Sequence, residues 1–393
     1  MKVLAIAHQS EFCGGANRSF LSVLLHLKND YHYDLLVLVP GEGAFSKKLK
    51  ENEIRYMSAS YQQTSYVCMG DVFDPYRFFK STLACFKNYR LARKLCKIVQ
   101  AENFDVIYMN DSTNSIGYYL AQMLDLPYVW HFRSYHFSIK KYMLFENKLR
   151  TDSKGKCVCI SNAMREYMHK VRGIEDHKLV VIHNGVDNLG VTIEQPWADN
   201  LTNGFHCIQC GHLSIAKGQV DSIKAIAELK KRGIQDIYLH IAGTPAVQHG
   251  KSYKDFLDEL VKECDVKENV IFEGEVSKLH ELRKHMQLEL MCSVCEPFGR
   301  VTVEAMQMGL PVVGSNTGGT LDIIVDGYNG LLYKQGNYHD LADKIERIYL
   351  NHDFGNALSE NCLKFSKTHF TMDGNVKEIE EVLRGCAIKG TKC

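Results

Sequence analysis

The sequence predicts an α/β protein made of two doubly wound domains, each built on a parallel sheet. Short apolar runs rich in β-branched residues alternate with longer segments of helical periodicity, as βαβ units require. These runs fall into two series of similar length, separated by a stretch without periodicity. The length of 393 residues suits two to three domains at roughly 150 residues each.

The first series predicts the first domain, which we place at residues 1–186. Its helices are expected between the strands, for example at residues 16–27 and 112–123. The expected strands lie at residues 3–7, 35–39, 106–109, 128–130, 157–160 and 180–182.

The second series predicts the second domain, which we place at residues 205–370. Its strands are expected at residues 207–210, 238–242, 270–272, 288–293, 312–314 and 330–333. Its helices are expected at residues 219–231, 253–263, 302–308 and 338–351.

Two further segments complete the predicted architecture. Residues 187–204 are rich in Asn and Gly and have no periodicity, which is typical of an interdomain linker. Val376, Ile379, Val382 and Leu383 recur at helical spacing, so we expect residues 371–393 to form a helix that packs back on the first domain. Doubly wound domains bind ligands at the carboxyl ends of their strands, and two facing domains would form a cleft.

Composition excludes several classes of protein. The apolar fraction of 45% and charged fraction of 24% are those of a folded chain rather than a disordered one. The net charge of +1 gives no overall field that would recruit nucleic acid. No apolar run approaches the roughly 18 residues that span a bilayer. The apolar run at residues 3–7 is too short for a secretory leader, so we expect a cytoplasmic protein.

The cysteine pattern raises a metal hypothesis. Cys207 with Cys210 and Cys292 with Cys295 each form a C-x-x-C pair, but many more residues separate the pairs than in zinc ribbons. Both pairs also lie in apolar runs predicted as strands, where residues three apart point to opposite faces. Buried structural thiols are therefore expected, with a zinc site as the alternative.

The segment from Cys295 to Tyr333 carries the clearest chemistry. Glu296 follows a predicted strand, Pro297 and Gly299 force a turn, and a helix then starts near Arg300. The N–H groups at such a helix start can bind an anion such as a diphosphate. Glu304, in the first turns of the helix, could accept hydrogen bonds from the vicinal hydroxyls of a ribose. The alternative is that both glutamates are merely solvated beside an ordinary turn.

This segment resembles the donor-binding signature of the retaining glycosyltransferases of family four. The shared pattern is E-P-F-G-x-V-x-x-E-A-M-x-x-G-x-P-V-V, followed by G-G and D-G-x-N-G. The runs CGHLSIAKGQVDSIKAIAEL, LHIAGT, VIFEGEV, VWHFR and VIHNGVD are also similar to segments of that family, so the resemblance covers nearly the whole chain. It implies the GT-B fold, in which two Rossmann-like domains face each other across a cleft.

The resemblance also implies roles for individual residues. Lys217 would pair with the donor diphosphate, Glu304 would hold the ribose and Glu296 would bind the transferred sugar, with His131 beside it. Gly14 and Gly15 would open the first helix close to donor and acceptor. The remaining donor contacts would come from His212, Gly243, Thr244, Val276, Phe298, Gly299, Arg300 and Val301.

The implied reaction moves a sugar from a UDP- or GDP-type nucleotide sugar to a hydroxyl of a sugar or lipid-linked acceptor, with retention. Neither a cofactor nor a metal is expected, because Lys217 and the helix start would neutralise the leaving diphosphate. The expected pathway is surface polysaccharide or glycolipid synthesis. Alternatives are an epimerase or phosphorylase on the same scaffold, or a catalytically weak nucleotide-binding protein.

His212 departs from the family pattern, which usually has arginine at this position. Histidine is only partly protonated at neutral pH, so it would help the leaving group less than a permanent cation. The alternative is that His212 simply packs in its loop.

Residues 77–97 predict a basic helix with seven basic residues and no acidic one. Lys80, Lys87, Arg90 and Lys94 share one face, which could dock on an anionic membrane at its inner surface. The alternative is a helix packed on the sheet with a solvated positive face. Arg133 is a weaker candidate, either for contact with the acceptor or membrane or as a loop cap.

Overall fold

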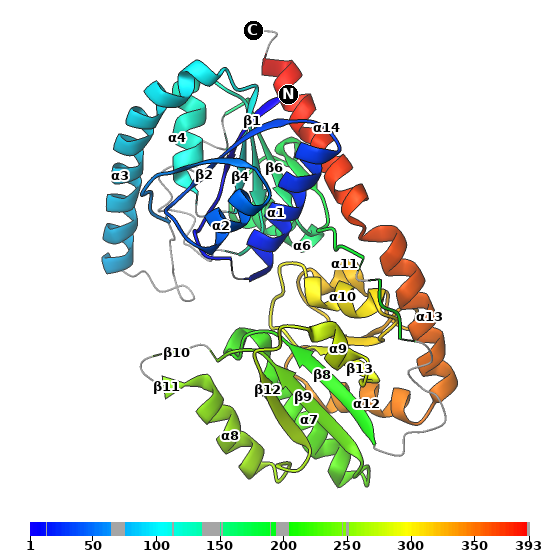
Figure 1. Ribbon diagram of the computed structural model, residues 1–393. Coiled ribbons are helices and arrows are strands. Elements are labelled where there is room, and N and C mark those ends of the chain that lie inside the picture. Colours follow the sequence, from blue (N-terminus) through cyan, green and yellow to red (C-terminus); the bar gives the residue numbers. More distant parts are fainter. Residues whose placement is uncertain are drawn as a thin grey trace. The chain divides into compact units, whose positions relative to one another are not determined.

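The computed structural model describes residues 1–12, 14–63, 75–111, 114–135, 150, 152–188, 190–193, 204–245, 247–248 and 251–390 (Figure 1). The chain forms two compact units. Unit 1 contains residues 1–185 and 372–393, and unit 2 contains residues 186–371.

Unit 1 is a seven-stranded parallel sheet with helices on both faces. The strand order is β3-β2-β1-β4-β5-β6-β7. The strands are β1 (Lys2–Ile6), β2 (Asp34–Val39), β3 (Arg55–Ser58), β4 (Val106–Asn110), β5 (Tyr128–Phe132), β6 (Gly155–Cys159) and β7 (Leu179–Val181). The main helices are α1 (Gly14–Asn29), α2 (Ala44–Glu51), α3 (Pro75–Val99), α4 (Ser115–Leu124), α6 (Asn162–Glu166) and α14 (Met372–Gly390).

The alternation of side chains along each strand divides the core of unit 1 in two. Leu4 and Ile6 pack with α3, α4 and α6 on one face of the sheet. Val3 and Ala5 pack with α1, α2 and α14 on the other. Because helices cover both faces, the central strands β1, β4 and β5 are buried along almost their whole length, as parallel strands usually are.

Unit 2 is a six-stranded parallel sheet with the order β12-β9-β8-β13-β14-β15. The strands are β8 (Phe205–Cys210), β9 (Ile237–Ala242), β12 (Val270–Gly274), β13 (Leu288–Met291), β14 (Val312–Ser315) and β15 (Leu331–Tyr333). The helices are α7 (Gln219–Lys231), α8 (Tyr253–Glu263), α9 (Leu279–Arg283), α10 (Arg300–Gln307), α11 (Thr320–Ile323), α12 (Tyr338–Tyr349) and α13 (His352–His369). A short antiparallel pair joins β10 (Val247–Gln248) to β11 (Lys251–Ser252).

The predicted α/β class and parallel sheets are confirmed, and each predicted strand corresponds to an observed one. The prediction missed β3, because its sequence RYMS lacks an apolar run and the strand lies half-exposed at the sheet edge. The predicted helix at 112–123 begins at Ser115, and residues 112–113 lie outside the described part. Of the predicted linker at 187–204, residues 189 and 194–203 also lie outside it.

Candidate active site

The topology of unit 2 brings two sequence motifs together. From β8 the chain proceeds to β9 and β12 on one side, and from β13 it proceeds to β14 and β15 on the other. Ligands of doubly wound sheets bind where the strand order reverses in this way, at the carboxyl ends of the strands. The loops after β8 and β13 touch there, since Val294 N donates to the carbonyl of Ala216 at 2.9 Å.

Lys217 and Glu296 meet at this point. Lys217 Nζ donates to Glu296 Oε2 at 2.6 Å, and the two side chains are 27% and 13% exposed. Sequence reasoning expected Lys217 to face a diphosphate and Glu296 to face a sugar, but it did not foresee their contact. The pair is accessible to solvent and to a ligand.

Groups at the ends of two strands hold Glu296 in place. Ser293 Oγ donates to Glu296 Oε2 at 2.9 Å, and Gly319 N donates to the Glu296 carbonyl at 2.7 Å. Ser315 Oγ, at the end of β14, donates to the carbonyl of Ser293 at 2.7 Å. The carboxylate is therefore oriented by groups that follow both β13 and β14.

A buried glutamine on β8 holds the backbone of Lys217. Gln209 on β8 is 3% exposed, and its Nε2 donates to the carbonyl of Lys217 at 2.7 Å. Ser222 Oγ on α7 donates to Gln209 Oε1 at 2.6 Å. The turn that carries Lys217 is thus tied to the strand before it and to the helix after it.

Helix α10 begins at Arg300, four residues beyond Glu296. Gly299 is its N-cap with φ of 106°, a left-handed conformation that favours glycine, and as a glycine it has no side chain to cap the helix. The helix start therefore presents its N–H dipoles without a capping side chain. Phe298 is 1% exposed and packs on Phe370, so of the predicted contacts from Phe298 only backbone ones are accessible. Val301 lies in the first turn.

Glu304 lies one turn further along α10, with its side chain 20% exposed. Its Oε2 is 3.5 Å from Arg283 Nη1, and its Oε1 is 3.7 Å from Arg300 Nη2. Both distances are ion-pair contacts longer than a normal hydrogen bond.

The other residues predicted to bind the donor follow the carboxyl ends of neighbouring strands in the same sheet. His212 follows β8 and is exposed, and its Nδ1 is 3.0 Å from Oγ1 of Thr244, which follows β9. Gly243 must be glycine, because a Cβ there would lie 1.9 Å from the carbonyl oxygen of Gly211. Val276 follows β12 and is half-buried. His212 is therefore not packed away in its loop.

In unit 1, His131 lies fully buried on β5. Tyr108 Oη lies 2.8 Å and Arg133 Nη2 3.3 Å from His131 Nδ1, while Nε2 has no partner among the described residues. Burial and the nearby Arg133 hold the pKa of His131 well below its usual value. Since arginine can only donate, Nδ1 accepts and the proton of the neutral ring sits on Nε2.

Arg133 organises this part of unit 1 rather than facing a membrane. It is 5% exposed, and it donates to Oδ1 of Asn110 at 2.7 Å and to Oδ1 of Asn184. The expectation of membrane contact is corrected, because a buried guanidinium with these partners cannot reach lipid. Gly14 and Gly15 are exposed at the start of α1, where Gly14 has φ of 74°.

Sequence reasoning missed several polar residues, some near His131 in unit 1 and one near the Lys217–Glu296 site in unit 2. In unit 1, His8, Asn110 and Asp111 lie at or just after strand ends, the position that could have identified them. In unit 2, Glu289 is a charged residue inside the apolar run LELM, a signal of a buried ion pair.

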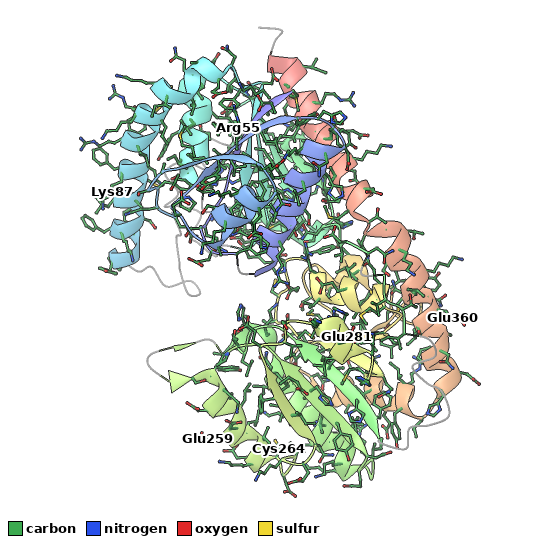
Figure 2. The ribbon with its side chains drawn as sticks, viewed as in Figure 1. Arg55, Lys87, Glu259, Cys264, Glu281 and Glu360 are labelled. Carbon is green, nitrogen blue, oxygen red and sulfur yellow. The ribbon has the colours of Figure 1, made fainter. Side chains whose placement is uncertain are left out.

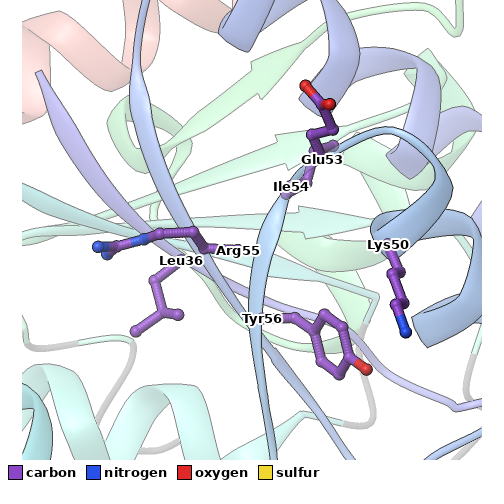
Figure 3. A pocket seen from close by; sticks show the side chains of 6 residues that line it. All are labelled: Leu36, Lys50, Glu53, Ile54, Arg55 and Tyr56. Atoms are coloured by element: carbon purple, nitrogen blue, oxygen red, sulfur yellow. The ribbon is translucent and has the colours of Figure 1, made fainter.

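Other candidate sites are weaker. A cavity of about 500 Å³ is lined by Leu36, Lys50, Glu53, Ile54, Arg55 and Tyr56 (Figure 3). It lies toward the amino ends of β2 and β3, opposite the edge where doubly wound sheets bind ligands. Across the described ranges, no group of three His, Cys, Asp or Glu side chains could hold a metal ion.

The two cysteines of each C-x-x-C pair lie in different surroundings. Cys207 and Cys292 are buried in one core cluster, and burial raises the pKa of both thiols. Cys210 is also buried but lies outside that cluster, and Cys295 is exposed.

Comparison with known proteins agrees with this geometry. Residues 13–188 match the family described as Glycosyltransferase Family 4, and residues 195–365 match Glycosyl transferases group 1. An uncharacterized glycosyltransferase of Methanocaldococcus jannaschii is 26% identical over 324 residues, 77% of this chain and 80% of that protein. A capsular polysaccharide biosynthesis glycosyltransferase of Staphylococcus aureus is 21% identical over 235 residues, 57% of this chain and 60% of that protein.

Solved structures share the fold. The crystal structure of HepE from Anabaena in complex with UDP has a TM-score of 0.80 and 23% identity, over 98% of this chain and 100% of that one. The two family matches lie one in each half of the chain, and the parallel sheets have the GT-B architecture. The chain therefore belongs to the family-four-type glycosyltransferases of the GT-B fold, as its motifs predicted.

Proposed function

We propose that this glycosyltransferase takes its sugar from a nucleoside-diphosphate sugar bound at the carboxyl edge of the unit 2 sheet, and transfers it with retention to an acceptor hydroxyl. The observation that carries the proposal is the pairing of Lys217 with Glu296 beside the uncapped start of α10. It combines a cation and helix dipoles for a diphosphate with a carboxylate for a sugar.

The ammonium of Lys217 has three donors, so it can hold Glu296 with one and a diphosphate oxygen with another. Among the described residues, none donates to Glu296 Oε1, which can accept from a sugar hydroxyl. In the proposed step, the bond from the anomeric carbon to the phosphate oxygen breaks and a bond to the acceptor oxygen forms on the same face. The acceptor proton passes to the departing phosphate.

Charge neutralisation in this scheme comes from the protein. The Lys217 ammonium, the Arg300 guanidinium and the dipoles at the start of α10 all favour the charge that grows on the leaving diphosphate. We therefore propose catalysis without a metal ion, and turnover should continue in excess EDTA. Loss of turnover that Mg²⁺ or Mn²⁺ restores would contradict this.

A uridine donor and a role in polysaccharide synthesis are the proposals that the relatives favour. HepE was crystallised with UDP, and the Staphylococcus aureus relative is named for capsular polysaccharide biosynthesis. We favour UDP over GDP on this basis. No observation favours an epimerase, a phosphorylase or an inactive scaffold.

Calorimetric titration with UDP, GDP and ADP tests the donor proposal, and product NMR after reaction with UDP-sugars tests retention. We expect UDP to bind most tightly and the new glycosidic bond to keep the anomeric configuration of the donor. Binding of no nucleoside diphosphate, or an inverted product, would overturn the proposal.

We also propose that α3 docks on an anionic bilayer that carries the acceptor. Lys80, Lys87, Arg90 and Lys94 are exposed, as expected, and the labelled Lys87 projects outward from α3 in Figure 2. Beyond the expectation, aromatic and aliphatic side chains on α3 are exposed too: Tyr76 by 73%, Phe79 by 69%, Leu83 by 43% and Phe86 by 57%.

Basic and aromatic side chains on one exposed helix suit the charged headgroup region of a membrane. The buried stripe of α3, including Cys85, Ala92 and Val99, belongs to the core cluster that also contains residues of α4 and β1. The helix is thus both a structural element and a candidate docking surface. Within the described segments, no helix is long and apolar enough to cross a bilayer.

A further inference from the structure

An arginine outside the recognised motifs lies directly behind the proposed donor site. Arg283, at the end of α9, is 1% exposed. Its Nε and Nη2 each donate to the carboxylate of Glu289 on β13 at 2.9 Å, and Nη2 also donates to the carbonyl of Val301 at 2.9 Å. Its remaining nitrogen, Nη1, lies 3.5 Å from Glu304 Oε2.

The direction of Nη1 follows from the other contacts. A guanidinium is planar, and a two-point contact with one carboxylate fixes the plane and the orientation of the fork. Glu289 is fully buried and takes both points of that contact. Nη1 is then held toward α10, where Glu304 is the carboxylate within ion-pair range.

Burying such a pair is costly, and an apolar pair of similar volume would often serve the fold equally well. Burial alone would lower the pKa of Arg283, but Glu289 and its neighbours outweigh this effect and raise it, so the guanidinium stays charged. A permanent charge is therefore maintained in the interior beside a half-exposed carboxylate. Packing of the core alone does not explain why a charged residue is buried at this position.

We propose that Arg283 is a positioning residue for nucleotide recognition: it orients the Glu304 carboxylate toward the two ribose hydroxyls of the donor. The distances of 3.5 and 3.7 Å from Arg283 and Arg300 steer Glu304 without occupying its oxygens in short hydrogen bonds. Both oxygens can still accept from neighbouring hydroxyls. The contact with Val301 also ties Arg283 to the first turn of α10. This inference rests on the donor site proposed above.

The test is the preference for ribose over dideoxyribose, measured as the Kd ratio of 2′,3′-dideoxy-UDP to UDP by calorimetry. Hydrogen bonds to a charged group predict a ratio on the order of 10 to 100 for the wild-type protein. Glu304→Ala should reduce the ratio to near 1. A general loosening of the site would weaken both ligands alike and leave the ratio unchanged.

The decisive variant removes the buried pair together, as Arg283→Met with Glu289→Leu, which leaves no unpaired charge in the core. We expect the ratio to fall about tenfold. Arg283→Lys provides a second variant that keeps a cation for Glu289 but loses the planar fork, and it should lower the ratio as well. The matched control is Arg232→Met, which removes a partly exposed arginine paired with Glu228, Asp343 and Glu346 at the end of α7. It should keep the wild-type ratio.

The outcomes separate the two proposals. If UDP does not bind the wild-type protein, or Glu304→Ala keeps the wild-type ratio, the proposed donor site fails and this inference fails with it. If Glu304→Ala abolishes the preference but Arg283→Lys or the folded double variant retains it, only the positioning role of Arg283 is overturned.

Discussion

Lys217 and Glu296 show how this fold brings together side chains from distant parts of the sequence. Each lies in a loop after a parallel strand, and neither loop alone would bring the two charges to 2.6 Å. Gln209 donates a hydrogen bond to the backbone carbonyl of Lys217, and Ser293 donates one to the carboxylate of Glu296. An electrostatic site prepared before the substrate arrives is what stabilises a developing charge most effectively.

Replacing Lys217 with methionine should lower kcat about 10²- to 10³-fold, because one preorganised cation at the leaving group is lost. Steady-state kinetics with the preferred nucleotide sugar would measure it. Lys217→Arg should retain more activity, and Lys231→Met, at the exposed far end of α7, should behave like the wild type. Wild-type turnover in Lys217→Met would remove this residue from the mechanism.

His131 predicts a pH dependence of the stability of unit 1. Its folded pKa lies well below the usual value, so below about pH 6.5 the unfolded chain binds a proton that the folded chain does not. The free energy of unfolding therefore falls as the pH falls.

When the pH falls from 7.5 to 5.5, the free energy of unfolding of unit 1 should decrease by about 1.4 kcal/mol more in the wild-type protein than in His131→Gln. Hydrogen exchange of unit 1 amides, corrected for the intrinsic effect of pH, would measure the loss. His177→Gln, which changes an exposed histidine, should keep the wild-type slope. Equal slopes in the wild type and His131→Gln would mean that His131 is protonated in the folded state.

At the scale of elements, α3 has two chemically different faces. Cys85, Ala92 and Leu95 are buried in the core cluster that also contains Leu4 and Ile6 of β1, and they hold the helix in place. The opposite face carries exposed aromatic rings among cations, and Arg90 lies 5.8 Å from the centre of the Phe86 ring. Exposed apolar side chains clustered in this way mark an interaction surface.

Phe79→Ser with Phe86→Ser should weaken binding to anionic phosphatidylglycerol vesicles, because the rings no longer enter the interface. Lys87→Glu should weaken it further, by about 1 kcal/mol or more, and added salt should weaken the wild type. Vesicle sedimentation would measure each effect, with Lys47→Glu on α2 as the control. Equal binding to neutral phosphatidylcholine vesicles, or none to anionic ones, would contradict the docking proposal.

At the scale of the whole molecule, residues 372–393 belong to the same unit as residues 1–185. Helix α14 packs on the α1 side of the unit 1 sheet, with Val376, Ile379 and Leu383 buried. Tyr33 Oη donates to Glu380 Oε1 at 2.8 Å, across most of the sequence. The core of unit 1 is therefore incomplete without α14.

Ile379→Ala should destabilise unit 1 by about 2–5 kcal/mol, because a fully buried side chain is lost. Hydrogen exchange should show less protection in β4 and β5 and no change in the strands of unit 2. Ile388→Ala, 54% exposed on the same helix, is the matched control. A loss of protection in unit 2 instead would contradict the assignment of α14 to unit 1.

Local patterns predicted most of the strands and helices because apolar periodicity reports which side chains are buried. They failed at β3, where an edge strand shows no such pattern, and at Arg283 and Glu289, whose burial depends on each other. The motif around Glu296 and Glu304 predicted one border of the proposed site. It could not reveal that Lys217 pairs with Glu296, or that Arg133 is buried.

By itself, then, the sequence determined the α/β class, the run of elements and the motif residues of a glycosyltransferase, since these depend on neighbours along the chain. Only the tertiary structure decided which charges meet, which are buried and which face of α3 is exposed. The physical reason is that a charge interacts through space: its partner is set by strand order and loop packing, over separations of tens to hundreds of residues that no local pattern records.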